Sequence, residues 1–302
     1  NIPVEIPQFT SNISGVSIHG NTFSNWGQPG AGRAIRVGTA IGSGTVTGIA
    51  ITSNTFQMTV DRPEVIGGTA APGATGIGNI FNVSGTAKIQ KAVNAAFAND
   101  QINIAAGTYA ENVSVPASRP LNINGTGGTA FIAGTNGLTL ASNITFAAFS
   151  AATSGTLIQI NAGGVIQDGV DFAVTGSTVN MGAGTYPENV TINGKTNLTL
   201  QGVGPTSLIE PPDADNSIGI VITNSNGLTV QNLKIHTQGS ESQGIRVVGF
   251  ANPAVTGLTL QHLTINADGA APGIIGDPST DAVHSSWLIH GNTITAGARG
   301  IG

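Results

Sequence analysis

The residues most able to do chemistry gather in two acidic stretches of the C-terminal half. The first holds Glu210, Asp213 and Asp215, and the second holds Asp268, Asp277 and Asp281, followed by His284. Carboxylate oxygens suit Ca²⁺, so Glu210, Asp213 and Asp215 are candidate calcium ligands. Asp277, Asp281 and His284 are the candidates for acid–base catalysis. Prolines interrupt both stretches, and solvated surface loops are the favoured interpretation of each.

The other titratable residues form no obvious set. No Asp or Glu recurs inside the repeated strands at the spacing of about 30 residues that would place an acid beside a base. His19 and His290 share the phrase Ile-His-Gly-Asn-Thr, which favours a repeat position over catalysis. His236 and His262 have no partner at metal-ligand spacing. We therefore expect no catalytic residue, resident metal or cofactor outside the two acidic stretches.

The composition indicates what kind of chain carries these residues. Only 8% of the 302 residues are charged and the net charge is −5, against about 25% charged residues in an average soluble domain. The 44 glycines, together with Asn, Thr and Ser, favour short strands and tight turns. Without a basic run we expect no nucleic-acid partner, and without a long apolar run no membrane span. The absence of cysteine excludes disulfides and thiolate metal sites.

Short strand-like segments recur along the chain at a nearly constant interval. Asn197-Leu-Thr-Leu, Gly227-Leu-Thr-Val, Gly257-Leu-Thr-Leu and Trp287-Leu-Ile-His start at a spacing of 30, and the phrase at Gly15 returns at Gly48, a spacing of 33. Units of this size must stack to bury their alternating apolar residues. The sequence predicts an all-β fold, a right-handed parallel β-helix (β-solenoid) with coils of about 30 residues. Its predicted interior rows are Leu198, Leu228, Leu258 and Leu288, and Leu200, Val230 and Leu260.

A second, longer repeat overlies the first. The segment that opens Ile89-Gln and runs to Gly-Thr-Tyr-Ala-Glu-Asn-Val returns from Ile166, at a spacing of 77. Each copy starts with a helical apolar pattern, which predicts short capping helices at about 88–98 and 166–174, with Phe97 and Val174 as buried anchors. We interpret the Gly-Thr-Tyr-x-Glu-Asn-Val motif as structural. The predicted modules are 1–78 (coils and a Gly/Pro-rich linker), 79–157 and 158–302, and a helix packed on a solenoid flank is the alternative.

These segments resemble the N-terminal portion of pectin-lyase-like right-handed β-helix proteins. The resemblance rests on Ile-Gln-x-x-Val, on Ile-x-Ile-x-x-Gly-Thr-Tyr-x-Glu-Asn-Val and on the Gly-Leu-Thr-Leu strands, and it covers most of the chain from Lys88 onward. In that superfamily such a helix commonly caps the first coil. Its members include polysaccharide lyases, hydrolases and surface proteins without catalytic activity, so the resemblance implies a fold rather than an activity.

Three classes of function compete. The leading hypothesis is a structural, extracellular or cell-surface protein of a fibre, sheath or adhesin, built by head-to-tail association of copies, with glycans as a further kind of partner. The alternative is a carbohydrate-active enzyme, a polysaccharide lyase or hydrolase, with its site in the loops from Glu210 to Asp215 or from Asp268 to His284. An ice- or mineral-binding face of Thr ladders is weaker, because the Thr spacing between coils varies.

The ends of the sequence suggest how copies would associate. Ile289-His-Gly-Asn-Thr-Ile repeats Ile18-His-Gly-Asn-Thr-Phe. Counting 13 steps from Ile289 to Gly302 and 18 more to Ile18 of a following copy gives 31, which lies between the spacings of 30 and 33. We therefore expect the solenoid to continue from one copy into the next, covalently or non-covalently.

Overall fold

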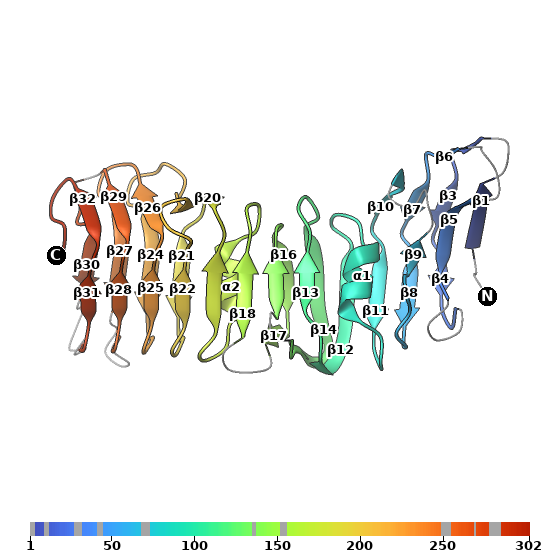
Figure 1. The fold of residues 1–302 in the computed structure, drawn as a ribbon, viewed down its shortest axis with the longest axis horizontal. Helices are drawn as coiled ribbons and strands as arrows, with labels where there is room; N and C mark the ends of the chain where they lie inside the picture. Colours follow the sequence, from blue (N-terminus) through green and yellow to red (C-terminus); the bar gives the residue numbers. More distant parts are fainter. Residues whose placement is uncertain are drawn as a thin grey trace. The chain divides into compact units, whose positions relative to one another are not determined.

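The computed structural model describes residues 4–8, 12–26, 32–40, 45–67, 73–134, 137–151, 156–248, 255–268, 270–277 and 285–302. Contacts divide the chain into two compact units. The first comprises residues 1–134 with 143–150, and the second comprises residues 135–142 with 151–302. Within the described residues, each unit consists mainly of short strands that pair in parallel and carries one seven-residue helix (Figure 1).

In the first unit, like residues of successive repeats pair across each sheet. For example, Phe23 pairs with Phe56 and Phe56 with Phe81, and the stacked ring centroids lie 5.0 and 4.7 Å apart. The strands, sheet by sheet, are β1 (Val4–Gln8), β5 (Ile35–Ala40) and β9 (Ile66–Gly67); β3 (Ser17–His19), β7 (Ala50–Thr52) and β10 (Thr75–Ile77); β4 (Thr22–Phe23), β8 (Thr55–Met58), β11 (Ile80–Val83), β12 (Gln101–Tyr109), β14 (Leu121–Ile132), β16 (Ile144–Ala147) and β17 (Phe149–Ala151); and β2 (Ile13–Ser14) with β6 (Val46–Thr47), while β13 (Val113–Val115) is a further strand of this unit.

The second unit stacks its strands with greater regularity. Leu200 pairs with Val230 and Val230 with Leu260, and all three side chains are fully buried. The strands, sheet by sheet, are β15 (Leu138–Leu140), β18 (Leu157–Ile160), β19 (Thr178–Met181), β22 (Thr199–Gln201), β25 (Thr229–Gln231), β28 (Thr259–Gln261) and β31 (Leu288–His290); β20 (Gly184–Tyr186), β23 (Ser207–Ile209), β26 (Lys234–Thr237), β29 (Thr264–Ala267) and β32 (Thr293–Ala296); and β21 (Val190–Asn193), β24 (Ile218–Thr223), β27 (Gln243–Val248) and β30 (Ile274–Asp277).

These stacks of parallel strands agree with the predicted all-β architecture and are consistent with a β-solenoid. In the last three described repeats of the second unit, the corner between two consecutive strands contains a residue in the left-handed conformation. Asn232, His262 and Gly291 occupy it in successive repeats of the second unit, with φ of 54°, 53° and 65°. Only glycine adopts this conformation without strain, and asparagine tolerates it better than most residues.

One predicted interior position is wrong. Leu198, Leu228 and Leu258 are buried as predicted, but Leu288 is 53% exposed. Leu288 pairs with Thr259 rather than with Leu258. Paired residues of β28 and β31 are 29 apart in the sequence, whereas those of the two preceding strand pairs are 30 apart. Since a shift of one residue turns a strand side chain to the opposite face, Leu288 leaves the interior, and Ile289 continues the other interior row, that of Leu200, Val230 and Leu260.

Both predicted helices are present, although shorter than expected. Helix α1 spans Ile89–Ala95 and helix α2 spans Ile166–Phe172. The prediction that Phe97 and Val174 anchor them is wrong, because both residues follow the helix ends and are only partly buried. The buried helix residues are Ile89, Ala92, Val93 and Ala95 in α1, and Ile166, Gly169, Val170 and Phe172 in α2.

Contacts place each helix beside strands. Helix α1 contacts β11, β12 and β13, and helix α2 contacts β18, β19 and β21.

Part of the predicted linker is also strand, because Thr75–Ile77 forms β10 and pairs with β7. Gly76 in this strand has no room for a side chain, since a Cβ atom there would lie 2.2 Å from the Phe97 ring. The division into modules at residues 78 and 157 stays a prediction. No helix among the described residues is long and apolar enough to cross a membrane.

Candidate functional site

The acidic stretches meet at a histidine that bridges two carboxylates. His236 lies in β26, Glu210 directly follows β23, and Asp268 directly follows β29. These three strands are neighbours in one sheet. The Nδ1 atom of His236 lies 2.8 Å from Glu210 Oε1, and its Nε2 atom lies 3.0 Å from Asp268 Oδ2. The sheet thus brings Glu210, His236 and Asp268 together across three successive repeats.

The contacts favour the protonated imidazolium of His236. An ionised carboxylate only accepts hydrogen bonds, so two such partners require an N–H on both ring nitrogens. The hydrogen bond to Asp268 is the main cause that raises the pKa of His236 above its ordinary value; the Glu210 contact adds to it and partial burial opposes it. The three side chains are 23%, 32% and 59% exposed in the order His236, Glu210, Asp268.

This arrangement is better suited to joining neighbouring repeats than to acid–base catalysis. A glycosidase needs two carboxylates that face a substrate and a water molecule, whereas here the imidazole occupies the space between them. A general base needs a free lone pair, whereas both nitrogens of His236 contact carboxylates. The row therefore acts as an ionic clamp across three repeats.

The other predicted site residues either lie apart from this row or fall outside the described residues. Asp215 accepts hydrogen bonds from the backbone N–H (3.0 Å) and the hydroxyl (2.7 Å) of Ser240, and Asp213 is exposed. Asp277 ends strand β30, and its side chain is outside the described part of the structure, as are Asp281 and His284. Among described residues, no group of three or more His, Asp and Glu side chains could hold a metal ion. The calcium site and the catalytic role of Asp277, Asp281 and His284 stay predictions.

Sequence reasoning missed His236 because the repeats differ in corner length. Strands β22 and β23, which carry Leu200 and Ile209, are separated by a longer corner than β25 and β26, which carry the matching Val230 and Ile235. Consequently Glu210 and His236 meet at a sequence separation of 26. His236 and Asp268 meet at 32 for another reason, because Asp268 lies two residues beyond Asn266, the residue that pairs with His236. A search at a fixed spacing of 30 finds neither pair. Alignment of the second strand of each repeat, Leu208-Ile209-Glu210 on Lys234-Ile235-His236, would have found the first.

The Gly-Thr-Tyr-x-Glu-Asn-Val motif holds the helices in place. Glu188 accepts hydrogen bonds from the first two backbone N–H groups of α2, Ile166 (2.7 Å) and Gln167 (3.0 Å). Glu111 accepts the matching pair from Ile89 (2.9 Å) and Gln90 (3.0 Å) of α1. Burial raises the pKa of Glu188, and these two hydrogen bonds oppose the rise.

The tyrosine of the motif is also a structural residue. The Tyr186 hydroxyl donates toward the carbonyls of Ile160 and Gly182, each at 3.0 Å, and burial raises its pKa to about 12. The Tyr109 hydroxyl donates to Ala105 O at 2.9 Å. Because these side chains turn inward to bond backbone atoms, they do not offer a ring face for stacking on sugar.

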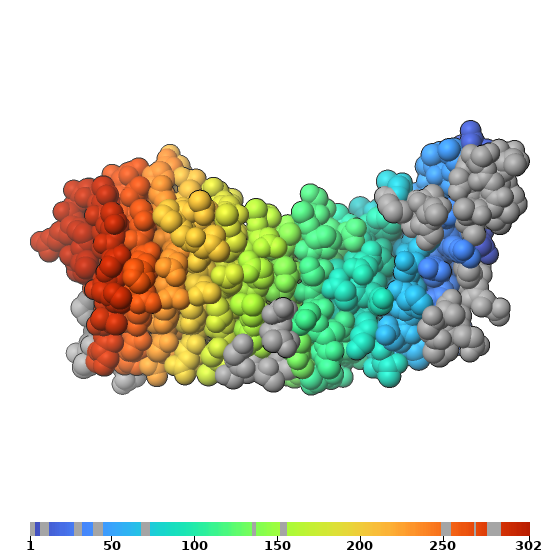
Figure 2. Space-filling view, in the orientation of Figure 1, coloured from blue at the N-terminus to red at the C-terminus, as the bar shows by residue number. Residues whose placement is uncertain are grey.

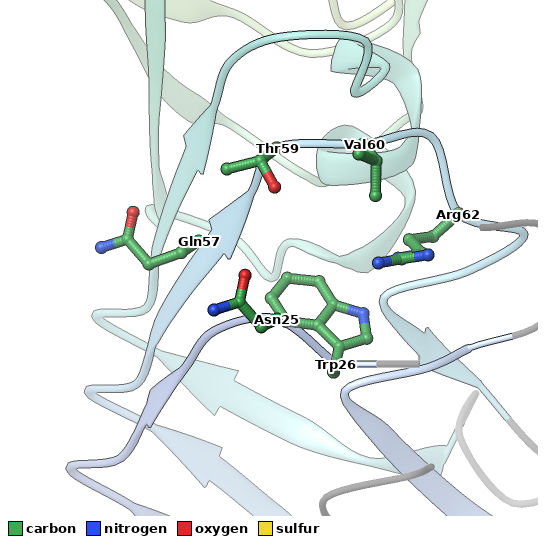
Figure 3. A pocket seen from close by; sticks show the side chains of 6 residues that line it. All are labelled: Asn25, Trp26, Gln57, Thr59, Val60 and Arg62. Atoms are coloured by element: carbon green, nitrogen blue, oxygen red, sulfur yellow. The ribbon is translucent and has the colours of Figure 1, made fainter. Parts of the chain in front are cut away.

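A small recess in the first unit holds two buried donor groups. Trp26 and Arg62 line it with Asn25, Gln57, Thr59 and Val60 (Figure 3). Trp26 is 3% and Arg62 8% exposed, and neither Trp26 Nε1 nor Arg62 Nη1 has a hydrogen-bond partner among the described residues. The accessible volume of about 10 Å³ suits a single acceptor atom such as that of a water molecule. It is too small for a sugar ring or other organic ligand.

A regular polar face covers the longest sheet of the second unit. Thr178, Thr199, Thr229 and Thr259 pair in register although their successive sequence separations are 21, 30 and 30. Unequal spacing therefore does not break the Thr ladder, and the reason for disfavouring it was wrong. Beside it runs a ladder of amide side chains, each of which donates to the preceding repeat: Asn180 to Gln159, Gln201 to Asn180, Gln231 to Gln201 and Gln261 to Gln231.

No protein-family model, curated protein or solved structure matches the chain.

Proposed function

We propose that the chain is a structural β-solenoid with right-handed coils of about 30 residues, which builds an extracellular or cell-surface fibre, sheath or adhesin by head-to-tail association. The pectin-lyase-like resemblance supports this winding. The low charge and the Thr and amide ladders support a scaffold in repetitive contact with its neighbours, including glycans.

The observation that carries the proposal is the regular stacking of like side chains across successive repeats of the second unit, in the Thr ladder and the amide ladder of its longest sheet. Apolar side chains are also exposed in the last described repeat of this unit, which contains β31 and β32. Leu288 and Ile301 are each 53% exposed there, and the interior-row residue Ile289 is only partly buried. In Figure 2 this repeat, in red, lies at one end of the second unit's stack. Exposed apolar side chains on a strand favour pairing with another chain, and repeated stacking of copies produces a fibre.

Sedimentation velocity over a range of concentrations tests this proposal. The wild-type protein should form larger species as concentration rises, and Leu288→Lys should shift this association to at least tenfold higher concentration. Val203→Lys is the matched control, because Val203 is also apolar, 60% exposed and in the second unit, but lies between β22 and β23. A wild-type protein that stays monomeric at all concentrations would overturn the proposal.

The enzyme alternative places its site in the two acidic stretches, from which Glu210 and Asp268 both contact His236. Incubation with acidic and neutral polysaccharides, followed by assays for unsaturated products and reducing ends, distinguishes the two. We expect no turnover. Turnover that His236→Gln or Asp281→Asn abolishes would replace the structural proposal with a lyase or hydrolase.

A further inference from the structure

Two buried donor groups of the first unit line the recess between two successive repeats. Trp26 follows β4 and Arg62 follows β8, and these two strands pair in parallel. Trp26 is 3% and Arg62 8% exposed, yet Trp26 Nε1 and Arg62 Nη1 have no hydrogen-bond partner in the described part of the unit. Figure 3 shows the indole nitrogen of Trp26 on the side of the ring nearest the Arg62 guanidinium. Both groups only donate hydrogen bonds, so the recess calls for an acceptor.

Packing fixes the direction of the Trp26 N–H group. Asn25 has a φ of 52° and turns the chain directly after β4. The Trp26 ring then meets the Phe56 ring edge to face, with centroids 6.4 Å apart and planes at 85°. Phe56 is fully buried in the stack of rings with Phe23 and Phe81. The core of the unit therefore holds the donor in place before any ligand binds.

The positive charge of Arg62 has no counter-charge beside it. A guanidinium is always protonated in proteins. Two other arginines of the unit form ion pairs, Arg33 with Glu64 at 2.5 Å and Arg36 with Glu5 at 3.5 Å. Arg62 is more buried than either and forms no ion pair among the residues that the structure describes. A buried charge without a partner is strongly unfavourable.

The remaining carboxylates of the first unit do not neutralise this charge. Besides Glu5 and Glu64, the unit contains only Asp61, Asp100 and Glu111. Asp100 accepts hydrogen bonds from two backbone N–H groups, and Glu111 accepts from the first two of α1. Asp61 is exposed and forms no ion pair within the described ranges. The unit therefore has to take the counter-charge from solution.

We propose that the recess binds one monatomic anion of the halide class, which accepts hydrogen bonds from Trp26 Nε1 and the Arg62 guanidinium and joins the repeats of β4 and β8. Its volume of about 10 Å³ suits a single atom, and sulfate, phosphate and carboxylate groups are too large for it. A water molecule accepts the same hydrogen bonds but does not neutralise the charge. The site lies inside the first unit, so it goes beyond the proposed function and does not depend on the association of copies.

Tryptophan fluorescence measures this binding directly, because Trp287 is the only tryptophan besides Trp26. The parent protein for the titration is Trp287→Phe, kept dilute. Sodium chloride exchanged for sodium gluconate at constant ionic strength should change its emission along a saturating curve, with half of the change at about 1–10 mM chloride, a modest affinity. Sulfate and gluconate are too large for the recess and should leave the emission unchanged.

Two arginine variants in the same background test the assignment. Arg62→Met keeps an unbranched side chain and removes the charge, so it should raise the chloride concentration at half-change at least about tenfold. Arg36→Met is the matched control, because Arg36 lies in the same unit and pairs with Glu5; it should leave the curve unchanged. A parent protein without a saturating response, an equal response to sulfate, or an equal response of Arg62→Met would overturn the anion site.

Thermal unfolding of the wild type gives a second measurement that needs no tryptophan substitution. An anion that binds only the folded protein raises the unfolding temperature. Replacing about 100 mM gluconate with chloride should raise this temperature by about 2–4 °C for the wild type and by less than about 1 °C for Arg62→Met. In gluconate the variant should be the more stable protein, because it lacks the buried charge. Equal gains from chloride in both proteins would show that the recess holds only water, and would overturn the proposal.

Discussion

The Glu210–His236–Asp268 row makes stability depend on pH. Because the pKa of His236 is raised in the folded protein, its stabilising contribution is fully present below the unfolded value of about 6.5 and is lost as pH rises through the raised pKa. The difference in unfolding midpoint between the wild type and His236→Gln should therefore be larger at pH 5.5 than at pH 8.5. Exposure limits the effect to below about 1 kcal/mol. A pH-independent difference would contradict the imidazolium assignment.

Glu188 offers a second prediction at the residue scale. It supplies both acceptors for the first turn of α2, which has no side-chain cap of its own. Glu188→Ala should lower the free energy of unfolding by about 1–2 kcal/mol, in the range of a lost helix cap. Glu188→Gln keeps one acceptor oxygen and should lose less. Urea unfolding measures the free energy of unfolding of both variants. A Glu188→Gln protein less stable than Glu188→Ala would contradict the capping role.

The strand stacks yield a prediction that tests their register. Leu228 is 1% exposed, whereas Leu288, a later member of the same predicted row, is 53% exposed. Leu228→Ala should cost about 2–5 kcal/mol, as for other buried leucines, and Leu228→Asp should unfold several repeats. Leu288→Ala should change the stability of the monomer by less than about 0.5 kcal/mol. Thermal unfolding at low concentration compares the two, and similar losses would show that the register is wrong.

At the level of elements, the sequence predicts the buried rows of strand residues better than it predicts the number of residues in the corners between strands. Alternation identified the strands β22, β25 and β28 and the buried rows through Leu228 and Val230, because burial imposes a period of two. It failed at Leu288 and at His236, because both depend on the number of residues in a corner. Corners face solvent and tolerate insertion, so a longer corner leaves no mark on the apolar pattern.

The helices show the same limit. Their apolar pattern predicted where they begin, but Phe97 and Val174 lie beyond their ends. The capping carboxylates Glu111 and Glu188 each lie at a sequence separation of 22 from the first N–H group that they bind. Their contact depends on the stacking of repeats rather than on local spacing, and so the motif that contains them could be recognised as structural without its partner being known.

For the whole molecule, the central claim is that copies of the chain add end to end. The exposed side chains of Leu288 and Ile301 and the regular Thr and amide ladders are the observations that support this proposal. Electron microscopy of the concentrated wild-type protein, with Leu288→Lys imaged at the same concentration, tests the claim most directly. We expect unbranched filaments one chain wide for the wild type and separate particles for the variant. Separate particles in both samples would contradict the account.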